Sequence, residues 1–116
     1  MYRDRKFILF IFIISFFGCA HNVAEDSEQN CAETESFYVE TIAPILSQNC
    51  VGCHSGESPS GDLRLDSFTS VRNSMESTLD RVNRDQGSAG FMPQGGSKLT
   101  EDQMTSLQVF FEMDCE

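Results

Sequence analysis

The stretch Cys50-Val51-Gly52-Cys53-His54 decides how the rest of this chain folds. Two cysteines separated by two residues, with a histidine directly after the second, form the pattern of a covalent attachment site for a c-type haem. This spacing places the two thiols about one helical turn apart, so both can form thioether bonds with the vinyl groups on one edge of a porphyrin. The imidazole of His54 is then predicted to be the first axial ligand of the iron.

Two other kinds of site contain a Cys-x-x-Cys pair, the redox-active dithiol and half of a zinc site. A dithiol of the thioredoxin type belongs to a strand–helix unit, which the residues around Cys50 and Cys53 do not predict. A zinc site needs a second pair of ligands, but the remaining cysteines are distant in sequence and the other histidine is His21. The complete motif therefore favours haem attachment.

The amino terminus predicts export. Three basic residues lie at its start, Arg3, Arg5 and Lys6. They are followed by an apolar run of eleven residues, Phe7 to Phe17. Because this run is too short to span a bilayer but has the length of a signal-peptide core, we expect residues 1–18 to be a signal peptide.

Cys19 directly follows this segment. The pair Gly18-Cys19 resembles the lipobox of bacterial lipoproteins, in which the cysteine is lipidated and the chain is cut just before it. Gly18-Cys19-Ala20 is also a small-x-small site, at which an ordinary signal peptide would be cut after Ala20. We favour lipidation of Cys19, which predicts a lipid-anchored protein on the periplasmic side of a bacterial membrane; ordinary cleavage predicts a soluble periplasmic protein.

The five cysteines divide among three roles. Cys19 is assigned to the lipid, and Cys50 and Cys53 are assigned to the haem. Cys31 and Cys115 are left, and an oxidising compartment favours a disulfide between them. Two free thiols are the alternative, because connectivity cannot be read from sequence.

Length limits the domain organisation. Removal of residues 1–18 leaves 98 of the 116 residues, which is enough for one small domain. Residues 19–30 are polar and acidic, a composition typical of a flexible tether. The haem domain is therefore expected to cover residues 31–116. Because its own apolar core would be small, a covalent haem would supply a large part of the interior.

Apolar residues recur at helical spacing in three segments, whereas alternating strand patterns are nearly absent. The first segment leads into Cys50 and contains Tyr38, Ile42, Ile45 and Leu46. Pro44 within it predicts either a bend or a helix start. The second segment has an apolar stripe of Phe68, Val71, Met75, Leu79 and Val82. Asp66 or Ser67 is its expected cap, and its middle, rich in Asn, Ser and Thr, would tolerate a break.

The third segment has the clearest helix start. Thr100 is its expected cap, and Gln103 completes a capping box. Leu99, just before the cap, can pack against the first turn of this helix. The residues expected to share the inward face are Met104, Leu107, Phe111 and Cys115. The three segments together predict an all-α fold, a small helical domain wrapped around one covalent haem.

A glycine-rich loop, Gly87 to Gly96, separates the second and third segments. Within it, Pro93 biases Met92 toward an extended backbone, which can direct the Met92 thioether toward a flat ligand. A thioether is a soft, neutral ligand that suits the sixth position of haem iron, so Met92 is predicted to be the second axial ligand. The alternative is a methionine that only fills the core, the role we expect for Met75 and Met104 on the predicted helices.

Five stretches follow one another along the chain: Ala43-Pro44-Ile45-Leu46, the Cys50–His54 motif, Gly61-Asp62-Leu63-Arg64-Leu65, Met92-Pro93 and Leu99-Thr100. With them, residues 37–114 resemble the class I c-type cytochromes, in particular small bacterial single-haem domains. Relatives usually carry a tryptophan in the last helix, where this chain has Phe110 and Phe111. The resemblance implies low-spin iron with His54 and Met92 as axial ligands, and a role in electron transfer.

The net charge of the chain limits which macromolecules it is expected to bind. Without residues 1–18 the chain has 5 Lys and Arg against 17 Asp and Glu, a formal charge of −12. Such a charge repels nucleic acids and anionic membrane surfaces, so we expect no nucleic-acid binding, and membrane contact through the lipid anchor only. A redox partner protein with a basic docking patch would be attracted to it.

Two functions are consistent with these features. The first is an electron carrier, not itself an enzyme, that uses one covalent haem c with His/Met ligation. The second is a haem protein that binds small ligands or reacts with peroxide at an open sixth iron site. No nucleophilic triad, carboxylate pair or phosphate loop is visible in the sequence. One haem in so short a domain also leaves little room for a substrate pocket.

Overall fold

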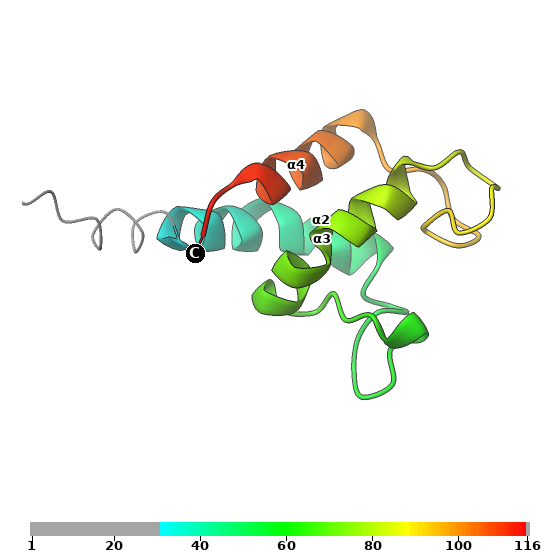
Figure 1. The fold of residues 1–116 in the computed structure, drawn as a ribbon, viewed down its shortest axis with the longest axis horizontal. Helices are drawn as coiled ribbons and strands as arrows, with labels where there is room; N and C mark the ends of the chain where they lie inside the picture. Colours follow the sequence, from blue (N-terminus) through cyan, green and yellow to red (C-terminus); the bar gives the residue numbers. More distant parts are fainter. Residues whose placement is uncertain (1–30, 116) are drawn as a thin grey trace, which may run out of the picture.

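The computed structural model describes residues 31–115, whose arrangement is shown in Figure 1. The predicted signal peptide (1–18), the lipidation site Cys19, the tether (19–30) and Glu116 lie outside the described residues. Residues 31–115 contain helices and no strand, which confirms the all-α prediction. Within this part of the chain, no helix combines the length and the hydrophobicity needed to cross a membrane.

The first helix runs without interruption from residue 31 to residue 49. It consists of an α-helical segment, a π-helical turn and a second α-helix: residues 31–37, η2 (Tyr38–Ile42) and α2 (Ala43–Asn49). Pro44 accounts for the π turn, because proline has no N–H to donate and its ring would collide with the carbonyl four residues earlier. The wider π turn avoids this collision and the missing hydrogen bond. Within it, the Ala43 N–H donates to the Tyr38 carbonyl.

The second helix, α3 (Phe68–Asn83), begins as predicted and shows no break. Ser67 is its cap, and the Ser67 hydroxyl accepts a hydrogen bond from the Ser70 N–H. Its apolar stripe faces the core, and the buried side chains are Val71, Met75, Thr78, Leu79 and Val82. Thr78 is tolerated in this stripe because its hydroxyl donates to the Ser74 carbonyl at 2.8 Å.

The last helix, α4 (Glu101–Glu112), starts with the predicted capping box. The Gln103 N–H donates to the Thr100 hydroxyl at 3.2 Å, and the Thr100 N–H donates to the Gln103 side chain at 3.0 Å. Leu99 is buried just before the cap, and Met104 contacts the core from the first turn. These contacts close the amino end of α4 and fix where the preceding loop ends.

The predicted inward face of α4 is wrong at Phe111 and Cys115. Phe110 is 0 % exposed and packs inward, whereas Phe111 is 42 % exposed. The face is centred between Leu107 and Phe110, and the turn of about 100° per residue carries Phe111 to its border. Cys115 lies beyond the last helical residue, so the chain end rather than the helix face directs its side chain.

The core lies where α4 packs against both α3 and η2 (Figure 1). Each of these elements contributes one aromatic ring, Tyr38 from η2, Phe68 from α3 and Phe110 from α4. The ring centroids lie 5.4 Å apart for Tyr38 and Phe68, 5.9 Å for Tyr38 and Phe110, and 6.1 Å for Phe68 and Phe110. Such contacts favour one packing arrangement of the three helices over others.

The carboxyl terminus is tied down in two ways. Cys31 and Cys115 form a disulfide with Cα atoms 4.7 Å apart, which confirms the predicted pairing. The Arg72 guanidinium donates to the carbonyls of Phe110 at 2.7 Å and Met113 at 2.8 Å. Because the last carbonyls of a helix have no partner within it, Arg72 supplies the donors that the end of α4 lacks.

Two long connections, residues 50–67 and residues 84–100, lie away from the carboxyl terminus (Figure 1). The first contains the Cys-x-x-Cys-His motif, and the second contains Met92. The helices therefore hold the two predicted iron-binding segments on connections that begin at the ends of α2 and α3.

Candidate functional site

The Cys-x-x-Cys-His motif continues directly from the end of α2. The Leu46 carbonyl accepts hydrogen bonds from the N–H groups of Cys50 at 2.8 Å and Val51 at 2.9 Å. The Cys50 carbonyl accepts hydrogen bonds from the N–H groups of Cys53 at 3.1 Å and His54 at 3.0 Å. These bonds wind the motif into a tight turn, so the two thiols and the imidazole project from one short, well-defined segment.

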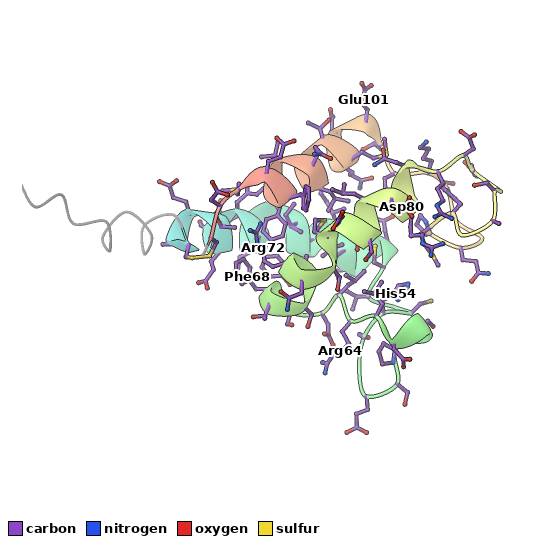
Figure 2. The ribbon with its side chains drawn as sticks, in the orientation of Figure 1. His54, Arg64, Phe68, Arg72, Asp80 and Glu101 are labelled. Atoms are coloured by element: carbon purple, nitrogen blue, oxygen red, sulfur yellow. A yellow bond between two sulfur atoms is a disulfide. The ribbon has the colours of Figure 1, made fainter. Side chains whose placement is uncertain are left out.

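The backbone of His54 is held from its other side as well. Its carbonyl accepts a hydrogen bond from the Leu65 N–H at 2.8 Å, and the Leu65 side chain is buried in the core. The Cys53 carbonyl accepts a hydrogen bond from the Ser60 N–H at 2.9 Å. The residues after the motif therefore fold back and fix its position. Figure 2 shows His54 in this connection between α2 and α3.

Asp66 closes the same loop from its far end. Its carboxylate accepts hydrogen bonds from the Arg64 guanidinium, the shorter at 3.0 Å, and from the Gly56 N–H at 3.2 Å. The hydrogen bond from Arg64, and then that from Gly56, lower the pKa of Asp66 below its usual value. The carboxylate thus stays ionised at neutral pH and keeps both donors.

Cys50 and Cys53 are free thiols, in contrast to the bridged pair. Cys53 is exposed and Cys50 is half-buried, and burial raises the pKa of Cys50 to about 11. A thiol with such a pKa stays protonated at neutral pH. In residues 31–115, moreover, no three His, Cys, Asp or Glu side chains are grouped to hold a metal ion.

His54 Nδ1 is the one side-chain nitrogen or oxygen in residues 31–115 that is buried without a hydrogen-bond partner. Leaving a buried polar atom unpaired costs about 1–3 kcal/mol, so such an atom requires an explanation. An imidazole with no competing protein hydrogen bond is available to bind a metal. Two free thiols beside such an imidazole fit the chemistry of a c-type haem.

Met92 lies in the second connection, where its side chain is half-buried and contacts the core. Its N–H donates to the carbonyl of Arg81 at 3.2 Å, and its peptide bond to Pro93 is cis. Phe91, just before it, is buried. Met75 is fully buried, as expected for a core residue. The placement of the Met92 sulfur at the sixth iron position stays a prediction.

In a comparison with known proteins, residues 50–93 match the family model described as Planctomycete cytochrome C. Residues 50–93 are therefore similar to a cytochrome c family domain. The match begins at the first cysteine of the motif and ends directly after Met92. This cytochrome c family implies covalent haem c, haem-based electron transfer, and a carrier rather than an enzyme. No curated protein and no solved structure gives a significant match.

Sequence reasoning missed side chains that hold the cytochrome c segment in shape. Asp66 was considered only as a helix cap, whereas it ties the loop after the motif together. Because Asp66 takes this role only when the loop folds back on itself, no local sequence pattern predicts it. Asp80 on α3 pairs with Arg84, the residue directly after the helix. Their spacing of four residues is typical of a helical ion pair and was visible in the sequence.

Proposed function

We propose that the protein is an exported electron carrier in which Cys50 and Cys53 bind one haem covalently and His54 and Met92 are its axial ligands. The observation that carries this proposal is the pair of free thiols beside an imidazole with a buried, unpartnered ring nitrogen. This pair begins the segment that matches a cytochrome c family. When bound, the haem supplies an iron that changes between the ferrous and ferric states.

Each side chain has a distinct role in this proposal. Each cysteine S–H adds across one vinyl group, so that sulfur bonds to one carbon and the hydrogen goes to the other, and no oxidant is required. His54 supplies a ring nitrogen, and the backbone bonds to Cys50 and Leu65 hold its ring at the motif. Met92 supplies a neutral sulfur, a ligand that favours the ferrous state and raises the reduction potential.

The charge distribution supports a partner with a basic docking patch. The ion pairs within residues 31–115 involve only two acidic residues, Asp66 and Asp80. The other acidic side chains described are exposed, while each basic side chain already donates to a carboxylate or a carbonyl. The surface therefore presents unpaired negative charge, which would attract a basic patch and repel nucleic acid.

We further propose that Cys19 is lipidated and anchors the protein on the periplasmic side of a bacterial membrane. Cys19→Ser should move the protein from the membrane fraction to the soluble periplasmic fraction without changing its haem spectrum. Ala20→Ser is the matched control and should leave the protein on the membrane. A wild-type protein that is already soluble and lacks Cys19 would show ordinary cleavage instead.

The axial role of Met92 is tested by Met92→Ala. We expect this variant to lose the weak charge-transfer band between methionine sulfur and ferric iron, and to bind imidazole readily at the freed position. The reduction potential should fall by on the order of 0.1 V or more, within the roughly 0.8 V range that axial ligands set. Absorption spectra and a redox titration of the purified haem protein measure both effects.

Met104→Leu is the matched control, because it replaces a half-buried methionine on α4 by an apolar residue of similar size. It should keep both the band and the potential. A wild-type protein without the band would favour the alternative function, in which the sixth iron site is open and binds small ligands or peroxide.

A further inference from the structure

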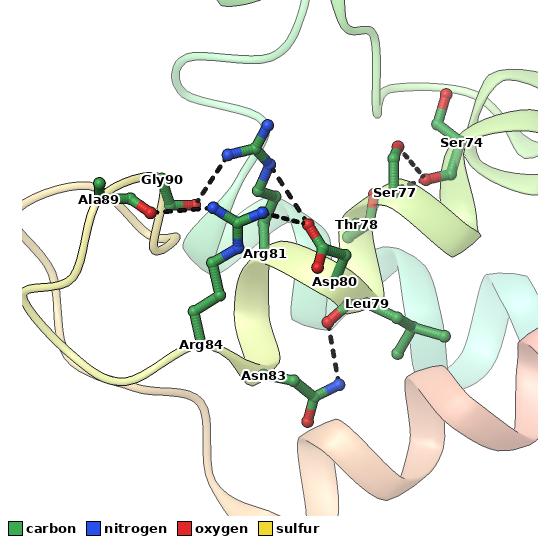
Figure 3. Close-up of polar contacts among 10 residues, drawn as sticks. All are labelled: Ser74, Ser77, Thr78, Leu79, Asp80, Arg81, Asn83, Arg84, Ala89 and Gly90. Carbon is green, nitrogen blue, oxygen red and sulfur yellow. Dashed lines mark hydrogen bonds and ion pairs between the residues drawn. The ribbon is translucent and has the colours of Figure 1, made fainter.

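Two arginines near the end of α3 contact the backbone of the loop that contains Met92 (Figure 3). The Arg84 Nη1 donates to the Ala89 carbonyl at 2.9 Å. The Arg81 Nη1 donates to the Gly90 carbonyl at 3.5 Å. These two carbonyls lie three and two residues before Met92, so both arginines act on the backbone that leads into it.

Asp80 orients both guanidinium groups. Its carboxylate accepts a hydrogen bond from Arg84 Nη2 at 2.6 Å and lies 3.7 Å from Arg81 Nε (Figure 3). The Arg84 side chain is only 35 % exposed, and its planar fork joins this carboxylate to the Ala89 carbonyl. A lysine has no such fork and could not make both contacts in the same geometry.

Gly90 lies directly beneath the arginine pair, Arg81 and Arg84. A Cβ added at Gly90 would collide with the Nη1 atoms of both arginines. Gly90 also has φ +75°, a conformation that side chains other than glycine rarely adopt. The loop backbone and the arginine pair can therefore approach this closely only because residue 90 has no side chain.

A third contact acts on Met92 itself, since its N–H donates to the carbonyl of Arg81 at 3.2 Å. The loop between Gly87 and Gly96 contains four glycines, which give it many alternative conformations. Three contacts with the end of α3 restrict residues 89–92 to one of these conformations.

We propose that the arginine pair positions Met92 for the sixth coordination site of the iron, by holding residues 89–92 against the end of α3. This role rests on the proposed axial ligation by Met92. Iron loses a loop-borne ligand whenever the loop opens, so contacts that favour the closed loop raise the fraction of iron with Met92 bound. Arg81 and Arg84 are positioning residues, because they act through the loop and not on the iron.

Imidazole binding to the ferric protein measures loop opening, because imidazole can occupy the sixth site only when Met92 has left it. Arg81→Gln combined with Arg84→Gln should raise the apparent imidazole affinity roughly three- to tenfold, the range expected for loss of the two hydrogen bonds from these side chains to the loop. Arg84→Lys keeps the charge and should show a smaller increase. The covalent haem content should be unchanged in both.

Two glycine variants provide a matched comparison. Gly90 and Gly95 have nearly the same backbone conformation, φ +75° and +72°, and both lie in the loop. A Cβ at Gly95 meets no atom within 4 Å, whereas one at Gly90 displaces the arginine pair. Gly90→Ala should therefore raise the apparent imidazole affinity more than Gly95→Ala, although the backbone strain is similar.

Hydrogen exchange of the Met92 amide gives a readout that does not depend on the iron spectrum. It should be faster in the double arginine variant than in wild type, again by roughly three- to tenfold. Gln108→Ala removes an exposed hydrogen bond to Glu112 on α4, remote from both long connections, and should leave it unchanged. If wild type shows the methionine–iron band, an unaltered imidazole affinity and Met92 exchange in the double variant would overturn the positioning role alone. Absence of that band in wild type would overturn ligation by Met92 and the positioning role with it.

Discussion

Replacing Cys50 and Cys53 together by alanine is expected to abolish covalent haem and to leave a domain that does not fold stably. Only twelve apolar residues are buried within residues 31–115, a small core for a domain of this size. The disulfide joins the two ends of the described residues, Cys31 and Cys115, but adds nothing to this interior. The mass of the polypeptide and its absorbance after denaturation measure covalent haem, and circular dichroism measures the helix content.

Gly52→Ala is the control for this double variant. It changes the same turn, but a Cβ at this position meets no atom within 4 Å, so haem attachment should be retained. The single variants at Cys50 and Cys53 should each keep one thioether bond. A stable, soluble, haem-free domain with full helix content from the double variant would contradict the view that haem completes the core.

Removing the disulfide with Cys31→Ser and Cys115→Ser is expected to cost a large share of the stability of the domain. The bridge joins residues 84 positions apart, and for a loop of this length the chain-entropy model gives roughly 4–5 kcal/mol. For a domain of this size, that loss corresponds to a decrease in Tm of roughly 16–40 °C. Thermal and denaturant unfolding of the haem-containing protein, followed by circular dichroism, measures the change.

Chemical reduction offers an independent control, because thiol reductants break disulfides but leave thioether bonds intact. Reduced wild-type protein should unfold at the same midpoint as the double serine variant, and the reductant should not shift the midpoint of that variant. Equal unfolding midpoints for oxidised wild type and the variant would show that the bridge does not stabilise the folded domain. The haem spectrum should be unchanged at low temperature, since the bridge lies at the opposite end from the two loops.

Local sequence patterns were sufficient to predict the helices. The stripe on α3 predicted its buried face, and Thr100 with Gln103 predicted the start of α4, because caps and periodicity act over one or two turns. Pro44 left two outcomes open. The structure shows a π turn in a continuous helix, since the residues before Pro44 already pack against α4.

The prediction of haem attachment also needed only local sequence, because its motif lies in five consecutive residues. The spacing of Cys50, Cys53 and His54 predicts covalent haem attachment independently of the surrounding sequence. The pairing of Cys31 with Cys115 followed from counting cysteines and from the predicted export to an oxidising compartment, and the structure confirms the pairing. Such inferences need only composition and local spacing.

Tertiary structure alone decided the contacts between segments that are distant in sequence. The periodicity of apolar residues did not determine whether Phe110 or Phe111 faces inward, because both lie near the apolar stripe of α4. The packing of α4 against α3 and η2 buries Phe110 and leaves Phe111 exposed. The fold likewise decided that the arginine pair reaches the loop that contains Met92. The physical reason is that residues close in sequence determine whether a segment is helical. Which side chains of other segments a residue contacts depends instead on how the whole chain folds.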